Sequence, residues 1–187
     1  ACWVETAAGS WQQARGETQK ALIHLKKAET QSPPAAAVDW LRITQADLLV
    51  SLAQNGTATT ILAPIISRED NSPTMHAAMA KLGVMKLKTK SPQHGIRLLK
   101  ESVDAEHANQ WPGKASARAD YALGLLMIGD ETAGLWQLTL AQQEFEIDRE
   151  TELLAKSLWN QWQYLKHSDA SKQDIEAART RLNTLQL

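Results

Sequence analysis

Clusters of turn-forming residues divide this chain into segments of helix length, and this division constrains the fold more than any other feature. The clusters are Ser32-Pro33-Pro34, Asn55-Gly56, Asn71-Ser72-Pro73, Ser91-Pro92, Trp111-Pro112-Gly113, Gly129-Asp130 and Ser168-Asp169-Ala170. Between them, apolar residues recur at spacings of three and four, as in amphipathic helices. We therefore expect ten helices, over residues 3–14, 17–31, 35–54, 58–68, 74–90, 93–107, 114–128, 131–146, 149–167 and 171–185.

Residue usage also favours helices. Ala, Leu, Gln and Glu are plentiful, and runs of β-branched residues are nearly absent. Hydrophobic residues make up 43% of the chain and charged residues 22%, which is typical of a folded, soluble protein. No apolar stretch approaches the roughly 20 residues that a membrane span needs. The sequence thus predicts a soluble all-α protein with no transmembrane segment.

One expected helix contains a proline. Pro64 lies within the apolar run 61–66, where it lacks the N–H group that a helix interior uses. We expect a kink or a split helix at this position. The preceding Asn55-Gly56 is a strong turn signal, and we favour a turn there over a glycosylation acceptor at Asn55-Gly56-Thr57.

The helices are expected to form five pairs. The first helix of each pair begins near residues 3, 35, 74, 114 and 149, a spacing of 32 to 40 residues. Periods of this size are typical of stacked helical repeats, in which each unit buries its apolar face against its neighbours. Residues 1–187 are then a single repeat domain; an irregular helical bundle is the alternative.

Small residues recur at fixed places in these pairs. The first pair has Ala8-Gly9 followed by Ala21, and the third has Leu82-Gly83 followed by Gly95. Gly9 to Ala21 and Gly83 to Gly95 are both twelve residues apart, and Leu123-Gly124 in the fourth pair is a partial match. Glycine in a helix costs about 1 kcal/mol relative to alanine, so these glycines need a packing reason. We expect each to let the facing helix approach the backbone closely.

This pattern resembles the tetratricopeptide repeat, which has a Leu-Gly pair on the first helix and a small residue on the second. The resemblance implies a right-handed superhelical stack of about five antiparallel helix hairpins, an α-solenoid. The sequence departs from the motif at the large aromatic positions, which hold Glu5, Gln12, Met79, Lys86, Asp120 and Met127. The second pair has Leu48-Leu49 where a Leu-Gly pair would align, and the fifth has no such pair.

The resemblance also implies a concave groove lined by the first helices, which holds a peptide or a partner helix. Mapped onto this sequence, the partner-binding positions are Thr6, Ser10, Gln13, Ala80, Val84, Leu87, Tyr121, Leu125 and Ile128. None is the Lys or Asn that would clamp a terminal carboxylate. The middle of the groove is apolar, which suits an amphipathic helix or a flanking segment of the same chain.

Charge and motifs exclude several other classes. Twenty basic residues against twenty-one acidic ones give a net charge of −1, which disfavours nucleic-acid binding. The five histidines do not pair at the four-residue spacing of a helical metal site; they are His24, His76, His94, His107 and His167. We interpret them as solvated helix-end residues, including the closest group, Asp104-Ala105-Glu106-His107. Phosphate-binding and hydrolase motifs are also missing, so we expect no catalysis, no metal and no cofactor.

Two further features allow alternatives. The seven tryptophans could be binding hot spots, but we interpret them as filling spaces between helices. Ala1-Cys2 could be the end of a lipoprotein processing site, which would anchor the protein through Cys2. We favour an ordinary cysteine in a helix that begins upstream, so that the chain is a domain excised from a longer protein.

The leading hypothesis is a non-catalytic adaptor or scaffold that binds a protein or peptide in an apolar groove. The alternative is a structural repeat segment of a larger multidomain or lipid-anchored bacterial protein, which packs on flanking domains without a separate ligand. An enzyme with a site in the groove is a third hypothesis, which the lack of convergent titratable residues disfavours.

Overall fold

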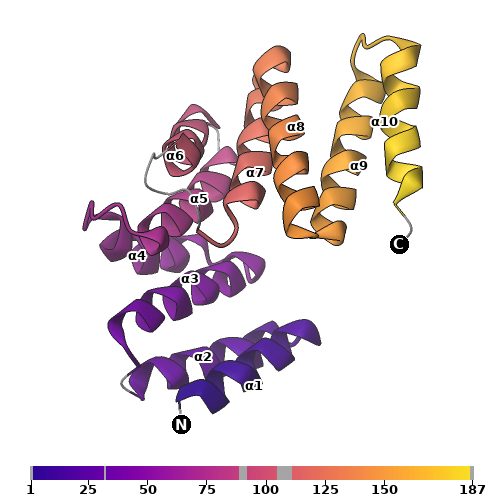
Figure 1. Ribbon diagram of the computed structural model, residues 1–187. Helices are drawn as coiled ribbons and strands as arrows, with labels where there is room; N and C mark the ends of the chain where they lie inside the picture. Colours follow the sequence, from indigo (N-terminus) through magenta and orange to yellow (C-terminus); the bar gives the residue numbers. More distant parts are fainter. Residues whose placement is uncertain (1, 32, 89–91, 105–110, 186–187) are drawn as a thin grey trace. The chain divides into compact units, whose positions relative to one another are not determined.

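The computed structural model describes residues 2–31, 33–88, 92–104 and 111–185 (Figure 1). All the secondary structure within these ranges is helical, which confirms the predicted all-α class. The ten helices are α1 (Cys2–Ala14), α2 (Thr18–Thr30), α3 (Ala35–Ser51), α4 (Asn55–Ile66), α5 (Pro73–Leu87), α6 (Pro92–Asp104), α7 (Lys114–Met127), α8 (Glu131–Asp148), α9 (Thr151–His167) and α10 (Lys172–Thr184). Each begins and ends within three residues of its expected bounds.

The chain forms two compact units, Ala1–Pro112 and Gly113–Leu187. In the first unit each helix from α1 to α6 packs on the next one along the chain, and α3 also packs on α5. The fully buried side chains here include Leu25, Leu49, Leu62 and Leu99. These leucines come from α2, α3, α4 and α6, so the core runs through the unit.

The second unit contains α7 to α10, again with each helix packed on the next. Its core joins Ala115, Ala141, Phe145, Leu154 and Leu158, with Leu182 of α10 packed against them. No helix among the described residues is both long and apolar enough to cross a membrane.

A buried glutamine connects three helices of the second unit. The amide of Gln142, which is fully buried on α8, donates to the Gln161 side-chain oxygen of α9 at 3.0 Å. Its own oxygen accepts from the Arg181 guanidinium of α10 at 3.0 Å, and Arg181 also binds Glu146. Since a buried amide is costly when unsatisfied, this network fixes α10 on α8 and α9.

The expected close approach at the glycines is confirmed in two helix pairs. A Cβ atom added at Gly9 would lie 3.0 Å from a methyl group of Leu25 and 3.4 Å from the carbonyl oxygen of Ala21. One added at Gly95 would lie 2.6 Å from the carbonyl oxygen of Gly83. Neither space admits a side chain without movement of its neighbours, which is why these helix positions hold glycine.

In the fourth pair, α7–α8, the close approach lies two residues earlier on α7 than the motif suggested. A Cβ atom added at Gly134 would lie 2.6 Å from Leu126 and 3.2 Å from the carbonyl oxygen of Ala122. Ala122, and not Gly124, therefore occupies the position equivalent to Gly83, and Ala122 to Gly134 is again twelve residues. The buried alanines Ala46 and Ala58 of α3–α4 have the same spacing.

Three of these pairs share one turn geometry. A single left-handed residue follows the first helix of each pair: Gly16 (φ 73°), Ala53 (φ 59°) and Gly129 (φ 84°). Each lies seven residues after the small residue of the first helix, namely Gly9, Ala46 and Ala122. The next backbone N–H donates to the carbonyl five residues back, as in the Schellman motif: Glu17 to Gln12 at 2.9 Å, Gln54 to Leu49 at 2.8 Å and Asp130 to Leu125 at 3.0 Å.

Helix α4 differs from expectation near both ends. Asn55-Gly56 is not the turn but the first two residues of the helix, because the left-handed residue is Ala53. Pro64 does not split the helix, which is continuous and ends two residues later at Ile66. A proline this close to the helix end removes one hydrogen bond in the last turn and leaves the earlier turns intact.

Candidate interaction site

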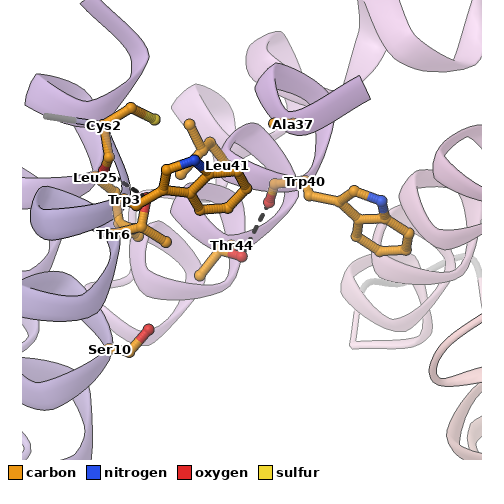
Figure 2. A pocket seen from close by; sticks show the side chains of 9 residues that line it. All are labelled: Cys2, Trp3, Thr6, Ser10, Leu25, Ala37, Trp40, Leu41 and Thr44. Carbon is orange, nitrogen blue, oxygen red and sulfur yellow. Dashed lines mark hydrogen bonds between the residues drawn. The ribbon is translucent and has the colours of Figure 1, made fainter. Parts of the chain in front are cut away.

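A hollow of about 190 Å³ lies between α1, α2 and α3 of the first unit (Figure 2). Nine residues line it: Cys2, Trp3, Thr6 and Ser10 of α1, Leu25 of α2, and Ala37, Trp40, Leu41 and Thr44 of α3. The indole of Trp3 projects from α1 across the space in front of Leu41 and Thr44. Carbon-rich side chains therefore form most of the wall.

The two tryptophans hold equivalent positions in their helices. Trp3 lies six residues before Gly9, and Trp40 lies six residues before Ala46. Gly9 is buried against α2, and Ala46 is 1% exposed. The shared helical spacing places both residues at the edge of the hollow, but only the Trp3 indole lies across it, whereas the Trp40 indole is directed away from Trp3 (Figure 2). Trp3 is 70% exposed and Trp40 is half-buried.

The hollow offers little polar chemistry. The Thr6 hydroxyl donates to the Cys2 carbonyl oxygen at 3.1 Å, and the Thr44 hydroxyl donates to the Trp40 carbonyl oxygen at 2.9 Å. Both hydroxyl protons are therefore used within their own helices. Among the nine lining residues, only Cys2 has a titratable side chain. Such a surface favours an uncharged, apolar occupant.

An ion cluster outside the hollow holds α1 on α2. The Glu5 carboxylate lies 2.5 Å from the Lys27 ammonium and 2.8 Å from His24 Nδ1. The hydrogen bond from Lys27 is the main cause that lowers the pKa of Glu5 below its ordinary value of 4.5, and His24 adds to it. These ion pairs help to hold α1 in place, because Gly9 is the only buried residue among those described in α1.

A second polar group fixes α3 against α2. Glu29 of α2 accepts from the Arg42 guanidinium at 2.8 Å and from the Gln45 amide at 3.0 Å. Gln45 is 2% exposed, so its amide is satisfied inside the packed unit. The two helices that carry the wall of the hollow are thus each tied to α2 by a different glutamate.

Asp39 anchors the other side of α3. This carboxylate is 6% exposed, and it accepts from the Thr74 hydroxyl of α5 at 3.2 Å and from the Arg68 guanidinium. The hydrogen bond to Asp39 raises the pKa of Arg68 above its ordinary value. Asp39 therefore joins α3, the α4–α5 connection and the start of α5.

The structure distributes the nine predicted partner-binding residues unevenly. Thr6 and Ser10 line the hollow, and Gln13 is exposed nearby on α1 but outside it. Val84 is half-buried and Ile128 is 45% exposed. The others are at most 8% exposed: Ala80, Leu87, Tyr121 and Leu125. These four offer little surface to a partner, whereas Thr6 and Ser10 border open space.

The interpretation of the tryptophans as fillers between helices is wrong for four of the seven. The four are exposed: Trp3 by 70%, Trp11 by 57%, Trp136 by 61% and Trp159 by 48%. Trp111 is buried, and Trp40 and Trp162 are half-buried. Trp159 and Trp162 contact each other, with ring centroids 5.0 Å apart, so they shield each other in part.

The interpretation of the histidines as solvated is wrong for His76, which is 2% exposed in α5. His94 and His167 are exposed, and His24 is half-buried beside Glu5. His107 lies outside the described residues, as do Ala105 and Glu106. Within the described parts of the chain, no three His, Cys, Asp or Glu side chains gather as metal ligands would.

Comparisons with protein-family models, with curated proteins and with solved structures returned no match to this chain. The described residues place the chain in the all-α class, and an apolar hollow lies between its first three helices.

Proposed function

We propose that this chain is a tetratricopeptide-like helical repeat protein that binds a partner's helix or peptide, with the hollow between α1 and α3 as the anchoring site. In this proposal, a large apolar side chain of the partner enters the hollow, and the protein acts as an adaptor or scaffold. Burial of apolar surface supplies the affinity.

The recurrent helix spacing supports the repeat architecture. In α1–α2, α3–α4 and α7–α8, a small residue is followed by a left-handed residue after seven positions and by a second small residue after twelve. The pair α5–α6 has the same twelve-residue spacing from Gly83 to Gly95. One local rule repeated along a chain is typical of stacked helical hairpins.

The observation that carries the binding proposal is the shared hollow of Trp3 and Trp40. Two tryptophans at the same position of successive first helices border one apolar space, and the indole of Trp3 lies across it (Figure 2). Pockets for small ligands usually measure about 300–1,000 Å³. At about 190 Å³ this hollow is smaller, and it suits one or two side chains of a protein partner.

The same lining supports a binding role over catalysis. The hollow brings together three hydroxyls, of which those of Thr6 and Thr44 are hydrogen-bonded within their own helices, together with one thiol and apolar groups. General acid–base chemistry needs a carboxylate, imidazole or amine within reach of the substrate. An apolar, uncharged wall instead matches the anchor pockets at the centre of protein interfaces.

The test is affinity capture of partners with the full chain, compared between the natural sequence and Thr44→Lys. The lysine places a charge in the hollow from a half-buried position on α3. Trp136→Ala is the matched control, because Trp136 is exposed on α8 of the other unit. Proteins retained by the natural chain and the control but lost with Thr44→Lys support the proposal.

A partner found in this way should also protect Cys2. Cys2 is the single cysteine of the chain and lines the hollow, so its rate of reaction with a thiol reagent reports on occupancy. We expect a peptide from the captured partner to slow the reaction. Identical capture with Thr44→Lys, or an unchanged rate at Cys2, contradicts the proposal.

A further inference from the structure

Helix α1, which the structure describes in full, buries no large apolar side chain. Trp3 and Val4 are each 70% exposed, and Trp11 is 57% exposed. The residues of α1 that are buried or half-buried are all small or polar: Cys2, Glu5, Thr6, Ala8, Gly9 and Gln12. Burial of apolar side chains is the main source of stability for a packed helix, and α1 has little of it.

Helix α3, which forms the opposite wall of the hollow, is anchored differently. It packs on α2, α4 and α5, and four of its aliphatic side chains are at most 5% exposed: Leu41, Ile43, Leu48 and Leu49. By contrast, α2 is the only described helix on which α1 packs extensively. Helix α1 can therefore leave its place without breaking the contacts among α2 to α6.

The ion cluster of Glu5 supplies the charged part of the attachment. Glu5 is the only charged residue of α1, so every ion pair of the helix involves it. Its side chain is 13% exposed, and its carboxylate lies 2.5 Å from the Lys27 ammonium and 2.8 Å from His24 Nδ1. Because the apolar contacts are few, these two contacts contribute a large share of what holds α1 on α2.

The turn between α1 and α2 can act as a hinge. It contains Gly16, which is exposed and has φ 73°. No atom lies within 4 Å of a Cβ atom added there, so a change of the backbone angles at Gly16 meets no obstacle. Hinges are short segments that absorb such changes while the flanking elements stay intact. Helix α1 can thus rotate away from α2 as a unit.

We infer that α1 is a movable wall of the hollow: it undocks from α2 while α2 to α6 stay folded, and the ion cluster of Glu5 holds it in the closed state. Helix α1 supplies Cys2, Trp3, Thr6 and Ser10 to the lining, so the hollow exists only while α1 is docked. An occupant of the hollow would favour the closed state by mass action. That consequence rests on the proposed function, whereas the opening of α1 does not.

The test is hydrogen–deuterium exchange of the full chain, followed by mass spectrometry of peptides from α1 and α3. Opening of α1 alone lets its amides exchange without global unfolding, so we expect them to exchange faster than those of α3. Glu5→Gln should speed exchange in α1 by about threefold or more and leave α3 unchanged. Lys27→Met should act in the same direction, because it removes the other half of the shorter contact.

Lys20→Met is the matched control. Lys20 lies on the same helix as Lys27 and is similarly exposed, but it pairs with Glu17 at the start of α2 and not with α1. Exchange in α1 should not change in this variant. Asp39→Asn, which weakens the attachment of α3 to α5, should speed exchange in α3 and leave α1 unchanged.

Two results would overturn the inference. Exchange in α1 that rises and falls with that of α3 across these variants would mean that α1 opens only when the whole unit unfolds. Exchange in α1 that is equal in the natural chain, Glu5→Gln and Lys27→Met would mean that the ion cluster does not hold it closed. Both results are independent of partner capture, so they leave the proposed function to its own test.

Discussion

The backbone of Gly83 lies so close to Gly95 that a Cβ atom added at Gly95 would be 2.6 Å from the Gly83 carbonyl oxygen. The same atom would lie 2.7 Å from the backbone nitrogen of Leu87. Both obstacles are main-chain atoms of α5, so a side chain at Gly95 cannot be accommodated by a change of rotamer alone. The contact between α5 and α6 therefore depends on a glycine at this position.

Gly95→Ala should lower the free energy of unfolding by roughly 2 kcal/mol, because the added methyl group forces α5 and α6 apart. The measurement is urea denaturation followed by circular dichroism. Gly56→Ala is the matched control: Gly56 is also helical, but no atom lies within 4 Å of its added Cβ. There alanine should raise stability by about 0.5 kcal/mol. Equal effects at the two sites would contradict the packing explanation.

Ala53→Gly should stabilise the protein by about 1 kcal/mol. Ala53 has φ 59°, a left-handed conformation that strains residues with a Cβ atom. Gly129 holds the equivalent place in the α7–α8 turn with φ 84° and no neighbour within 4 Å of an added Cβ. Gly129→Ala should therefore destabilise by about the same amount. Thermal unfolding of both variants checks the pair, and changes of the same sign would be inconsistent with the shared turn geometry.

Asp39→Asn should lower the free energy of unfolding by about 2 kcal/mol, since it weakens charged hydrogen bonds to Arg68 and Thr74 around a carboxylate that is 6% exposed. Asp47→Asn is the control. Asp47 pairs with Lys81 at 2.9 Å, but both side chains are about two-fifths exposed, at 39% and 43%. Its loss should cost less than about 1 kcal/mol. Comparable losses in urea denaturation would show that burial of Asp39 has no role.

The ion cluster of Glu5 predicts a dependence of stability on pH. Because Lys27 and His24 lower the pKa of Glu5 in the folded chain, the ionised carboxylate stabilises the fold above the ordinary pKa of 4.5. This contribution is lost as the pH falls through the lowered pKa of the folded state. The difference in free energy of unfolding between the natural chain and Glu5→Gln should therefore shrink on acidification from pH 7.

The Lys27→Met variant separates this effect from those of other carboxylates. Lys27 is the first cause of the lowered pKa, so its removal should return the pKa of Glu5 toward its ordinary value. Urea denaturation at several pH values should then show a weaker pH dependence in Lys27→Met than in the natural chain. A constant difference between the natural chain and Glu5→Gln at all pH values would be evidence against the cluster.

Sequence reasoning located the helices because breakers and apolar periodicity act locally. It also found the close approaches at Gly9 and Gly95, since a glycine within a helix needs a reason. It missed Ala46 and Ala122, because alanine is common in helices and carries no comparable signal. The turn at Ala53 was missed for a related reason, as a left-handed alanine has no sequence signature and the following Asn55-Gly56 does.

The hollow was only half predictable. Thr6 and Ser10 followed from the family resemblance, whereas Trp3 and Trp40 were assigned to the interior. Trp3 and Trp40 each lie six residues before the small residue of their helix, Gly9 and Ala46. This equivalence can be recognised only after the structure has shown that Ala46 occupies the position in α3 that Gly9 occupies in α1. Exposure of a tryptophan depends on which helices surround it, and that is a property of the assembled unit.

The three-residue turns have a consequence for how this chain can change in length. The turns within α1–α2, α3–α4 and α7–α8 each contain three residues between the flanking helices. The connection from α2 to α3 contains four residues, and the connection from α4 to α5 contains six. One residue added within such a turn rotates the second helix by about 100° and carries its small residue out of contact. A change of length within one of these three turns therefore separates the two small residues of that pair, whereas the connections from α2 to α3 and from α4 to α5 lie outside the pairs and can change length without parting them.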